Sequence, residues 1–180
     1  MVAADSAFFP DRKILKEMKN FNRTMTEERD MVSEYGALRQ KHKLPLLHDL
    51  DKEFCVGKLE ETDFLLRVIV SKMSERLEQV IKILGDLIQP ESQLANMYEA
   101  ESFTDEEKKH IFELFKRISA RHKELVINDF EHDEDSAAEL IKNTFNEWKD
   151  MKKDFLKILE KTKESWQNEK KSELELGYFG

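Results

Sequence analysis

Two polar residues interrupt apolar helical stripes at positions where they could act together. Glu28 falls in the stripe of one predicted helix and His122 in that of another, and both lie equally far from the start of their helix. If these two helices run in the same direction, a carboxylate and an imidazole at one level could bind a metal or transfer a proton. The other interpretation is a hydrogen-bonded polar layer that fixes the helix register. We favour this second interpretation because two side chains fall short of a metal's ligand set.

The motif of di-iron helical bundles occurs once in the chain. Glu107-Lys-Lys-His110 matches the Glu-x-x-His pattern, but such a bundle needs two copies of the motif and two further glutamates. Glu107 also follows Thr104 at the spacing of a capping box, in which the two side chains satisfy free amides at a helix start. The sequence therefore predicts a helix start at this point and no di-iron site.

Carboxylates alternate between residues 129 and 135 as in the opening of a calcium-binding loop. Such a loop requires a glycine at its sixth position and a glutamate at its twelfth. This chain has Glu134 and Leu140 there, so we expect a solvated turn between two helices.

The chain offers little to nucleophilic catalysis. No recognisable signature surrounds Cys55, the single cysteine, and we expect it to be a small apolar side chain beneath a loop. The five glycines are too scattered to form a phosphate-binding loop. With no complete catalytic constellation, the sequence favours a non-enzymatic protein without a cofactor.

The composition excludes several classes of protein. The 180 residues include 30 Lys and Arg against 38 Asp and Glu, a formal net charge of −8. Five glycines and three prolines are too few for a many-stranded β-fold. No apolar run approaches the ~18 residues that span a bilayer, and the first residues lack a targeting pattern. We therefore expect a cytoplasmic protein outside the membrane.

The charge is unevenly distributed along the chain. Nearly all of the excess negative charge lies in residues 91–180, concentrated around the turn near residues 129–135. Lysines between residues 152 and 163 alternate with carboxylates, which is typical of a solvated helix face. The acidic balance disfavours binding to nucleic acid, whose phosphates require Lys and Arg. If a partner recognises this protein by charge, we expect it to do so at the acidic turn.

Apolar residues recur at alternating steps of four and three in four long segments. This pattern predicts an all-α fold of a single domain over residues 1–180. Pro45 and Pro90 end the first two helices, and capping boxes that begin at Thr104 and Ser136 open the last two. We expect helices over residues 11–43, 58–89, 105–130 and 137–170, a connection over 44–57 that leaves room for a short helical turn before Gly57, and an irregular connection over 91–103.

Four antiparallel helices of ~45 Å each, joined by short or moderate connections, favour an up-down-up-down bundle. The four-three spacing predicts coiled-coil-like packing with axes close to parallel. In an alternative, open arrangement the last two helices form a hairpin and a second chain completes the bundle.

Apolar segments lie beyond the predicted helices at both termini, over residues 1–9 and 174–180. They either fold back to cap the apolar end of the bundle or dock on a partner, and we favour capping. The candidate interaction residues are Phe8, Phe9, Leu174, Leu176, Tyr178 and Phe179.

Together these features predict a non-enzymatic helical-bundle protein that acts through protein–protein contacts, with a partner protein or as a homodimer. The alternative is a metal-binding or redox bundle centred on Glu28 and His122.

Overall fold

The computed structural model describes residues 32–57, 64–90 and 93–167, and within these ranges the chain consists of helices and their connections, with no strand. The prediction of an all-α fold is therefore confirmed for the described residues. Parts of three predicted helices lie outside them, namely residues 11–31, 58–63 and 168–170.

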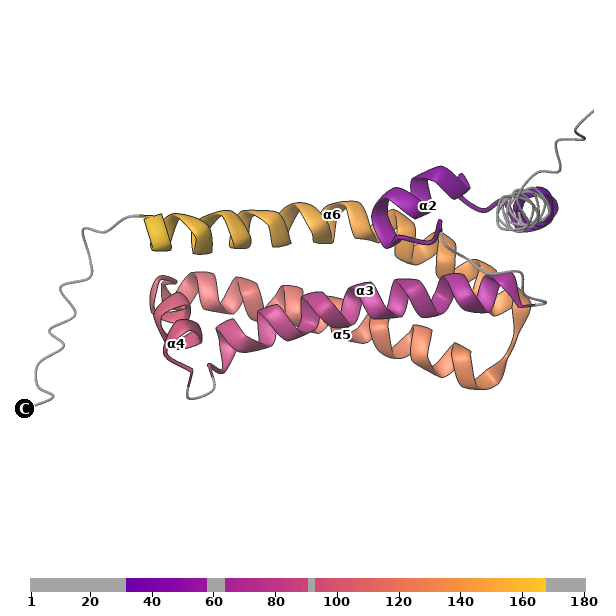
Figure 1. The fold of residues 1–180 in the computed structure, drawn as a ribbon. Coiled ribbons are helices and arrows are strands. Elements are labelled where there is room, and N and C mark those ends of the chain that lie inside the picture. The colour runs from indigo at the N-terminus through magenta and orange to yellow at the C-terminus, as the bar shows by residue number, and fades with distance from the viewer. Residues whose placement is uncertain (1–31, 58–63, 91–92, 168–180) are drawn as a thin grey trace, which may run out of the picture.

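Three long helices run side by side along the molecule (Figure 1). Arg67, near the start of the first of them, pairs with Asp129, near the end of the second, so these two are antiparallel. An ion pair between Arg121 and Glu147 joins the second to the third, which runs antiparallel to it. The three helices are α3 (Leu65–Ile88), α5 (Asp105–Glu131) and α6 (Glu134–Gln167).

The apolar stripes predicted from the sequence form the core between these helices. In α5 the stripe residues Ile111, Ile118 and Leu125 are buried, and Phe115 and His122 are half-buried. Each fully buried aliphatic side chain stabilises the fold by about 1.5–3 kcal/mol. Every predicted stripe position of the other two helices is buried: Leu66, Val70, Met73, Leu77, Val80, Leu84 and Leu87 in α3, and Ala137, Ile141, Thr144, Trp148, Met151, Phe155, Ile158 and Thr162 in α6.

A short helix, α2 (Leu47–Phe54), forms most of the predicted connection and packs against the middle of α6 (Figure 1). The ring of Phe54 lies 5.4 Å from the ring of Trp148. The indole N–H of Trp148 donates to the carboxylate of Glu53 at 2.8 Å. Leu50 and Val56 are also fully buried. The short helical turn allowed for in this connection is thus a helix of two turns that also supplies core side chains, which the sequence did not indicate because apolar helical spacing is hard to recognise in so short a run.

The described part of the first predicted helix, residues 32–42, crosses the end of the three-helix rod, and Figure 1 views it nearly end-on. The ammonium of Lys41 donates to the carboxylate of Glu134 at 2.9 Å, and the buried hydroxyl of Tyr35 donates to the carbonyl of Pro45 at 2.8 Å. Tyr35 is the one large apolar residue buried between 32 and 42, and Leu38 packs against the core from the same stretch. The up-down-up-down bundle of four long helices is not confirmed, because the described residues contain three long helices.

A second short helix, α4 (Leu94–Glu101), corrects the prediction of an irregular connection over 91–103. The hydroxyl of Tyr98 donates to the carbonyl of Ser165 on α6 at 2.7 Å. The ring of Tyr98 lies 4.7 Å from that of Trp166. These tertiary contacts with α6 stabilise a helix that is too short to persist alone, which is why the local sequence did not indicate it.

The α6 helix starts earlier than predicted. It begins at Glu134, so that Ser136, the predicted cap, lies inside the helix. Asp133 occupies the capping position: its carboxylate accepts the N–H of Asp135 at 3.2 Å and its carbonyl accepts the N–H of Ala137 at 2.9 Å. Aspartate and serine are about equally good caps, so the local pattern could not choose between them.

We predict that Trp148→Ala lowers the free energy of unfolding by about 3–5 kcal/mol, the usual cost of emptying a core aromatic site. Trp148 is 2% exposed and links α2 to α6. Chemical denaturation of the full chain measures the loss. Trp166→Ala is the control, because Trp166 is 53% exposed and should lose clearly less. Equal losses would contradict the placement of Trp148 in the core.

Two alanine substitutions test where α6 begins. Asp133→Ala should lower the free energy of unfolding by about 1 kcal/mol through loss of the cap. Ser136→Ala should leave it unchanged or raise it slightly, because alanine is the better residue inside a helix. Thermal denaturation of both variants gives the comparison, and the opposite ranking would place the cap at Ser136.

Candidate functional site

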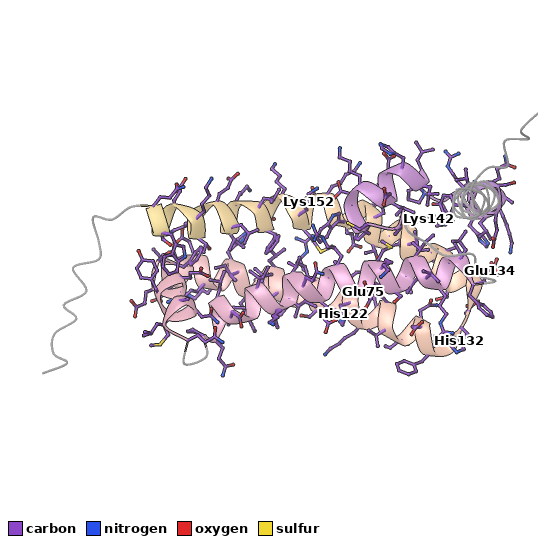
Figure 2. The ribbon with its side chains drawn as sticks, in the orientation of Figure 1. Glu75, His122, His132, Glu134, Lys142 and Lys152 are labelled. Carbon is purple, nitrogen blue, oxygen red and sulfur yellow. The ribbon has the colours of Figure 1, made fainter. Side chains whose placement is uncertain are left out.

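The two residues of the predicted polar layer have different outcomes. His122 is half-buried midway along α5 (Figure 2), whereas Glu28 lies outside the described residues. Within residues 32–57, 64–90 and 93–167, no three His, Cys, Asp or Glu side chains gather into a group that could hold a metal ion. The pairing of Glu28 with His122 stays a prediction.

The candidate interaction residues at the termini also lie outside the described part of the chain. Whether they cap the bundle or dock on a partner therefore stays a prediction as well. These residues are Phe8, Phe9, Leu174, Leu176, Tyr178 and Phe179.

Glu107 is a capping residue, as predicted. The hydroxyl of Thr104 accepts the N–H of Glu107 at 3.3 Å, and the carboxylate of Glu107 accepts the N–H of Thr104 at 2.8 Å. Lys161 on α6 donates to the same carboxylate. The bond from Lys161, followed by that from the Thr104 backbone, lowers the pKa of Glu107 to about 2. Capping and the α5–α6 contact thus account for the glutamate of the Glu-x-x-His motif, while His110 is exposed.

We predict that Glu107→Gln destabilises the protein at neutral pH and does so less as the pH falls. The pKa of Glu107 in the folded state lies below the usual 4.5. The ionised carboxylate therefore stabilises the fold above that usual value, and this stabilisation is lost as the pH falls towards 2. Urea denaturation from neutral pH down towards pH 2 measures the difference in the free energy of unfolding between the native protein and the variant.

The control for this experiment is Glu106→Gln, which changes an exposed neighbour in the same turn. Its stability curve should follow that of the native protein across the range. A gap for Glu107→Gln that does not change with pH would contradict the role of the ionised carboxylate.

Cys55 is exposed, which corrects the expectation of a side chain beneath a loop. It ends α2 in a left-handed conformation with a φ of 56°, and its N–H donates to the carbonyl of Asp51 at 2.8 Å. The following residue, Val56, takes the buried place. Because of this turn, the side chain of Val56 faces the core in place of that of Cys55. The residue types alone do not reveal which of the two is buried.

Three of the five lysines between residues 152 and 163 form ion pairs with carboxylates. The most buried of these carboxylates is that of Glu53, which accepts from Lys152 at 2.8 Å. Burial raises the pKa of Glu53, but the hydrogen bonds from Lys152 and Trp148 outweigh burial and hold it below its usual value. The three pairs are Lys152 with Glu53, Lys157 with Asp154, and Lys161 with Glu107.

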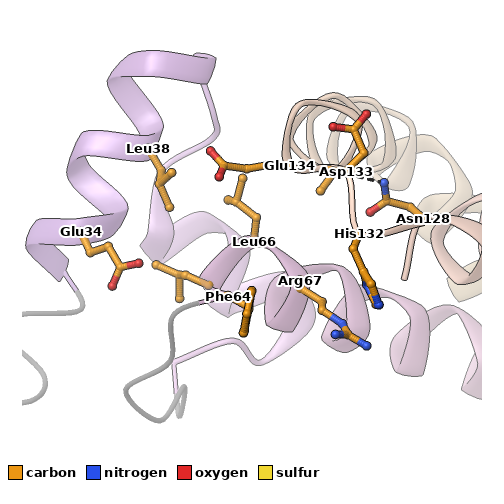
Figure 3. A pocket seen from close by; sticks show the side chains of 11 residues that line it. Glu34, Leu38, Phe64, Leu66, Arg67, Asn128, His132, Asp133 and Glu134 are labelled. Carbon is orange, nitrogen blue, oxygen red and sulfur yellow. Dashed lines mark hydrogen bonds between the residues drawn. The ribbon is translucent and has the colours of Figure 1, made fainter. Parts of the chain in front are cut away.

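A pocket of about 520 Å³ lies where residues 32–42, the start of α3 and the α5–α6 turn meet (Figure 3). Leu38, Leu66 and Ala137 give it apolar walls. Carboxylates from two elements also line it, Glu34 from the crossing helix and Asp133 from the turn. We call it the acidic-end pocket.

Arg67 and Lys41, two basic residues beside the acidic-end pocket, form ion pairs with carboxylates. Arg67, which lines the pocket, pairs with Asp129 at 2.7 Å. Glu134 accepts from Lys41 at 2.9 Å and lies 3.3 Å from the imidazole Nε2 of His42. The bonds from Lys41 and then His42 lower the pKa of Glu134. These pairs fasten the crossing helix to the first turn of α6.

The two other carboxylates of the pocket, Glu34 and Asp133, form no ion pair within the described ranges. Among the described residues, the pocket therefore combines apolar walls with two carboxylates that form no ion pair. The sequence indicated the acidic turn as the place for a charge-dependent contact. It did not reveal the pocket, because one wall belongs to a helix that was expected to run along the bundle.

Comparisons of the chain with protein-family models, with curated proteins and with solved structures find no match. Among the described helices, none is both long and apolar enough to cross a membrane. What the protein does therefore has to be inferred from its own contacts and surfaces.

Proposed function

We propose that this is a non-enzymatic helical protein that acts by binding a partner protein or a second copy of itself. The observation that carries the proposal is that large apolar side chains are exposed in small groups at the two ends of the three-helix rod. Such groups on an otherwise charged surface are typical of protein contact sites.

One group lies at the acidic end. Ile127 and Phe130 are three residues apart near the end of α5 and so lie on adjoining positions of one helix face. Phe130 is 78% exposed. A phenyl ring this exposed contributes nothing to the core, and the burial of its apolar surface in an interface would stabilise that interface.

The second group lies at the opposite end of the rod. It combines Leu94 and Met97 of α4 with Trp166 near the end of α6, which α4 contacts through Tyr98. Leu94 is 84% exposed. The long faces between the two ends carry most of the ion pairs, including Arg121–Glu147. The charged faces favour solubility, while the ends offer apolar surface for contacts.

We expect the full chain either to self-associate in sedimentation velocity or to crosslink to a partner in cell extract. The double variant Ile127→Ser with Phe130→Ser tests the acidic end, and Leu94→Ser with Met97→Ser tests the other. At least one of them should lose the contact, because interface energy concentrates in a few apolar anchors.

The matched control is Leu156→Ser, which changes an exposed leucine on α6 between the two ends. It should retain the contact, and all variants should keep the native helix content by circular dichroism. The proposal is wrong if the native protein neither self-associates nor crosslinks, or if both end variants behave as the native protein does.

A further inference from the structure

The acidic-end pocket combines apolar walls with a negative rim. Its volume of about 520 Å³ falls within the ~300–1,000 Å³ of ordinary binding pockets. Leu38 and Leu66 face it from two different elements, the crossing helix and α3 (Figure 3). A buried group in this pocket would therefore contact side chains that are held by separate parts of the fold.

The charge at the rim sets which occupant fits. Glu34 and Asp133 line the pocket from two different elements, the crossing helix and the α5–α6 turn, and Glu131 and Asp135 flank the same turn. The guanidinium of Arg67 is already paired with Asp129. An occupant gains from carrying positive charge, since it would pair with Glu34 and Asp133, which form no ion pair among the described residues.

We propose that the acidic-end pocket binds a basic segment of a partner protein, which inserts one aliphatic or aromatic side chain between Leu38 and Leu66 and places Lys or Arg against Glu34 and Asp133. This inference rests on the proposed protein-binding function and assigns it a site and a partner chemistry. The exposed Phe130 on the last turn of α5 extends the apolar surface beside the same turn.

Other chemistries fit the pocket less well. Nucleic acids and acidic ligands would be repelled by the rim carboxylates. A purely apolar ligand would displace water from beside those carboxylates and offer them neither a hydrogen bond nor an opposite charge in return. A basic segment with an apolar anchor satisfies both the walls and the rim.

The test uses the full chain and a fluorescent helical peptide with leucines at every third or fourth position and lysines elsewhere. We expect fluorescence anisotropy to show binding that weakens with added salt. A copy of the peptide with glutamate in place of lysine should not bind.

Variants of the full chain localise the binding. The double variant Glu34→Gln with Asp133→Asn should weaken binding roughly fivefold, since each exposed pair contributes modestly, and asparagine keeps the α6 cap. The control Glu78→Gln with Glu160→Gln removes two exposed charges elsewhere and should bind as the native protein does. Leu38→Ala should weaken binding without altering its salt dependence.

Three results would overturn the proposal. One is that the lysine peptide does not bind, and another is that it binds the Glu34→Gln/Asp133→Asn variant and the control equally. The third is that residues 12–23, which hold five basic residues and one acidic, exchange hydrogen faster in that variant than in the native protein when no peptide is present. This result would identify the chain's own segment as the occupant of the pocket. If the peptide fails while the Ile127/Phe130 double variant still loses a crosslinked partner, the protein-binding function stands and only the pocket assignment is wrong.

Discussion

The side-chain contact of α2 with the middle of α6 sets the direction from which the preceding chain reaches the three packed long helices. The rings of Phe54 and Trp148 lie in tilted contact, and Glu53 accepts hydrogen bonds from both the indole of Trp148 and the ammonium of Lys152. A buried indole N–H needs such an acceptor, since leaving it unpaired costs on the order of 1–3 kcal/mol. Through this contact a helix of 8 residues covers the face of α6 that a fourth long helix would otherwise cover.

The position of α2 has a direct consequence for the acidic end. Because α2 already lies beside α6, the chain before it reaches the bundle from the side, and residues 32–42 cross the end of the rod (Figure 1). Ion pairs from Lys41 to Glu134 and from Arg67 to Asp129 then fasten the elements around the turn. The acidic-end pocket is the space left where these elements meet at an angle, and its charge comes from the turn that joins α5 to α6.

How much of this could be predicted from the sequence depends on the length over which each pattern repeats. The stripes of α3 and α6 extend over many turns, so their buried positions, including Trp148 and Thr144, were identified correctly. The helices α2 and α4 span about two turns each, and tertiary contacts such as that of Tyr98 with Ser165 decide their structure. The start of α6 was misplaced because Asp133 and Ser136 are equivalent caps by residue type. The pocket could not be predicted, since it follows from the crossing angle of a helix, which no local pattern determines.

Zero-length crosslinking of the full chain with a carbodiimide, read out by mass spectrometry, tests whether α2 lies beside the middle of α6. We expect an amide between Glu53 and Lys152, whose side chains lie 2.8 Å apart. Lys152 is about 27 Å along α6 from Glu134 at 1.5 Å per residue, so a connection that only closed the end of a bundle could not reach it. Crosslinks from Lys152 to carboxylates of residues 11–30, with none to Glu53, would show instead that the first predicted helix covers the middle of α6.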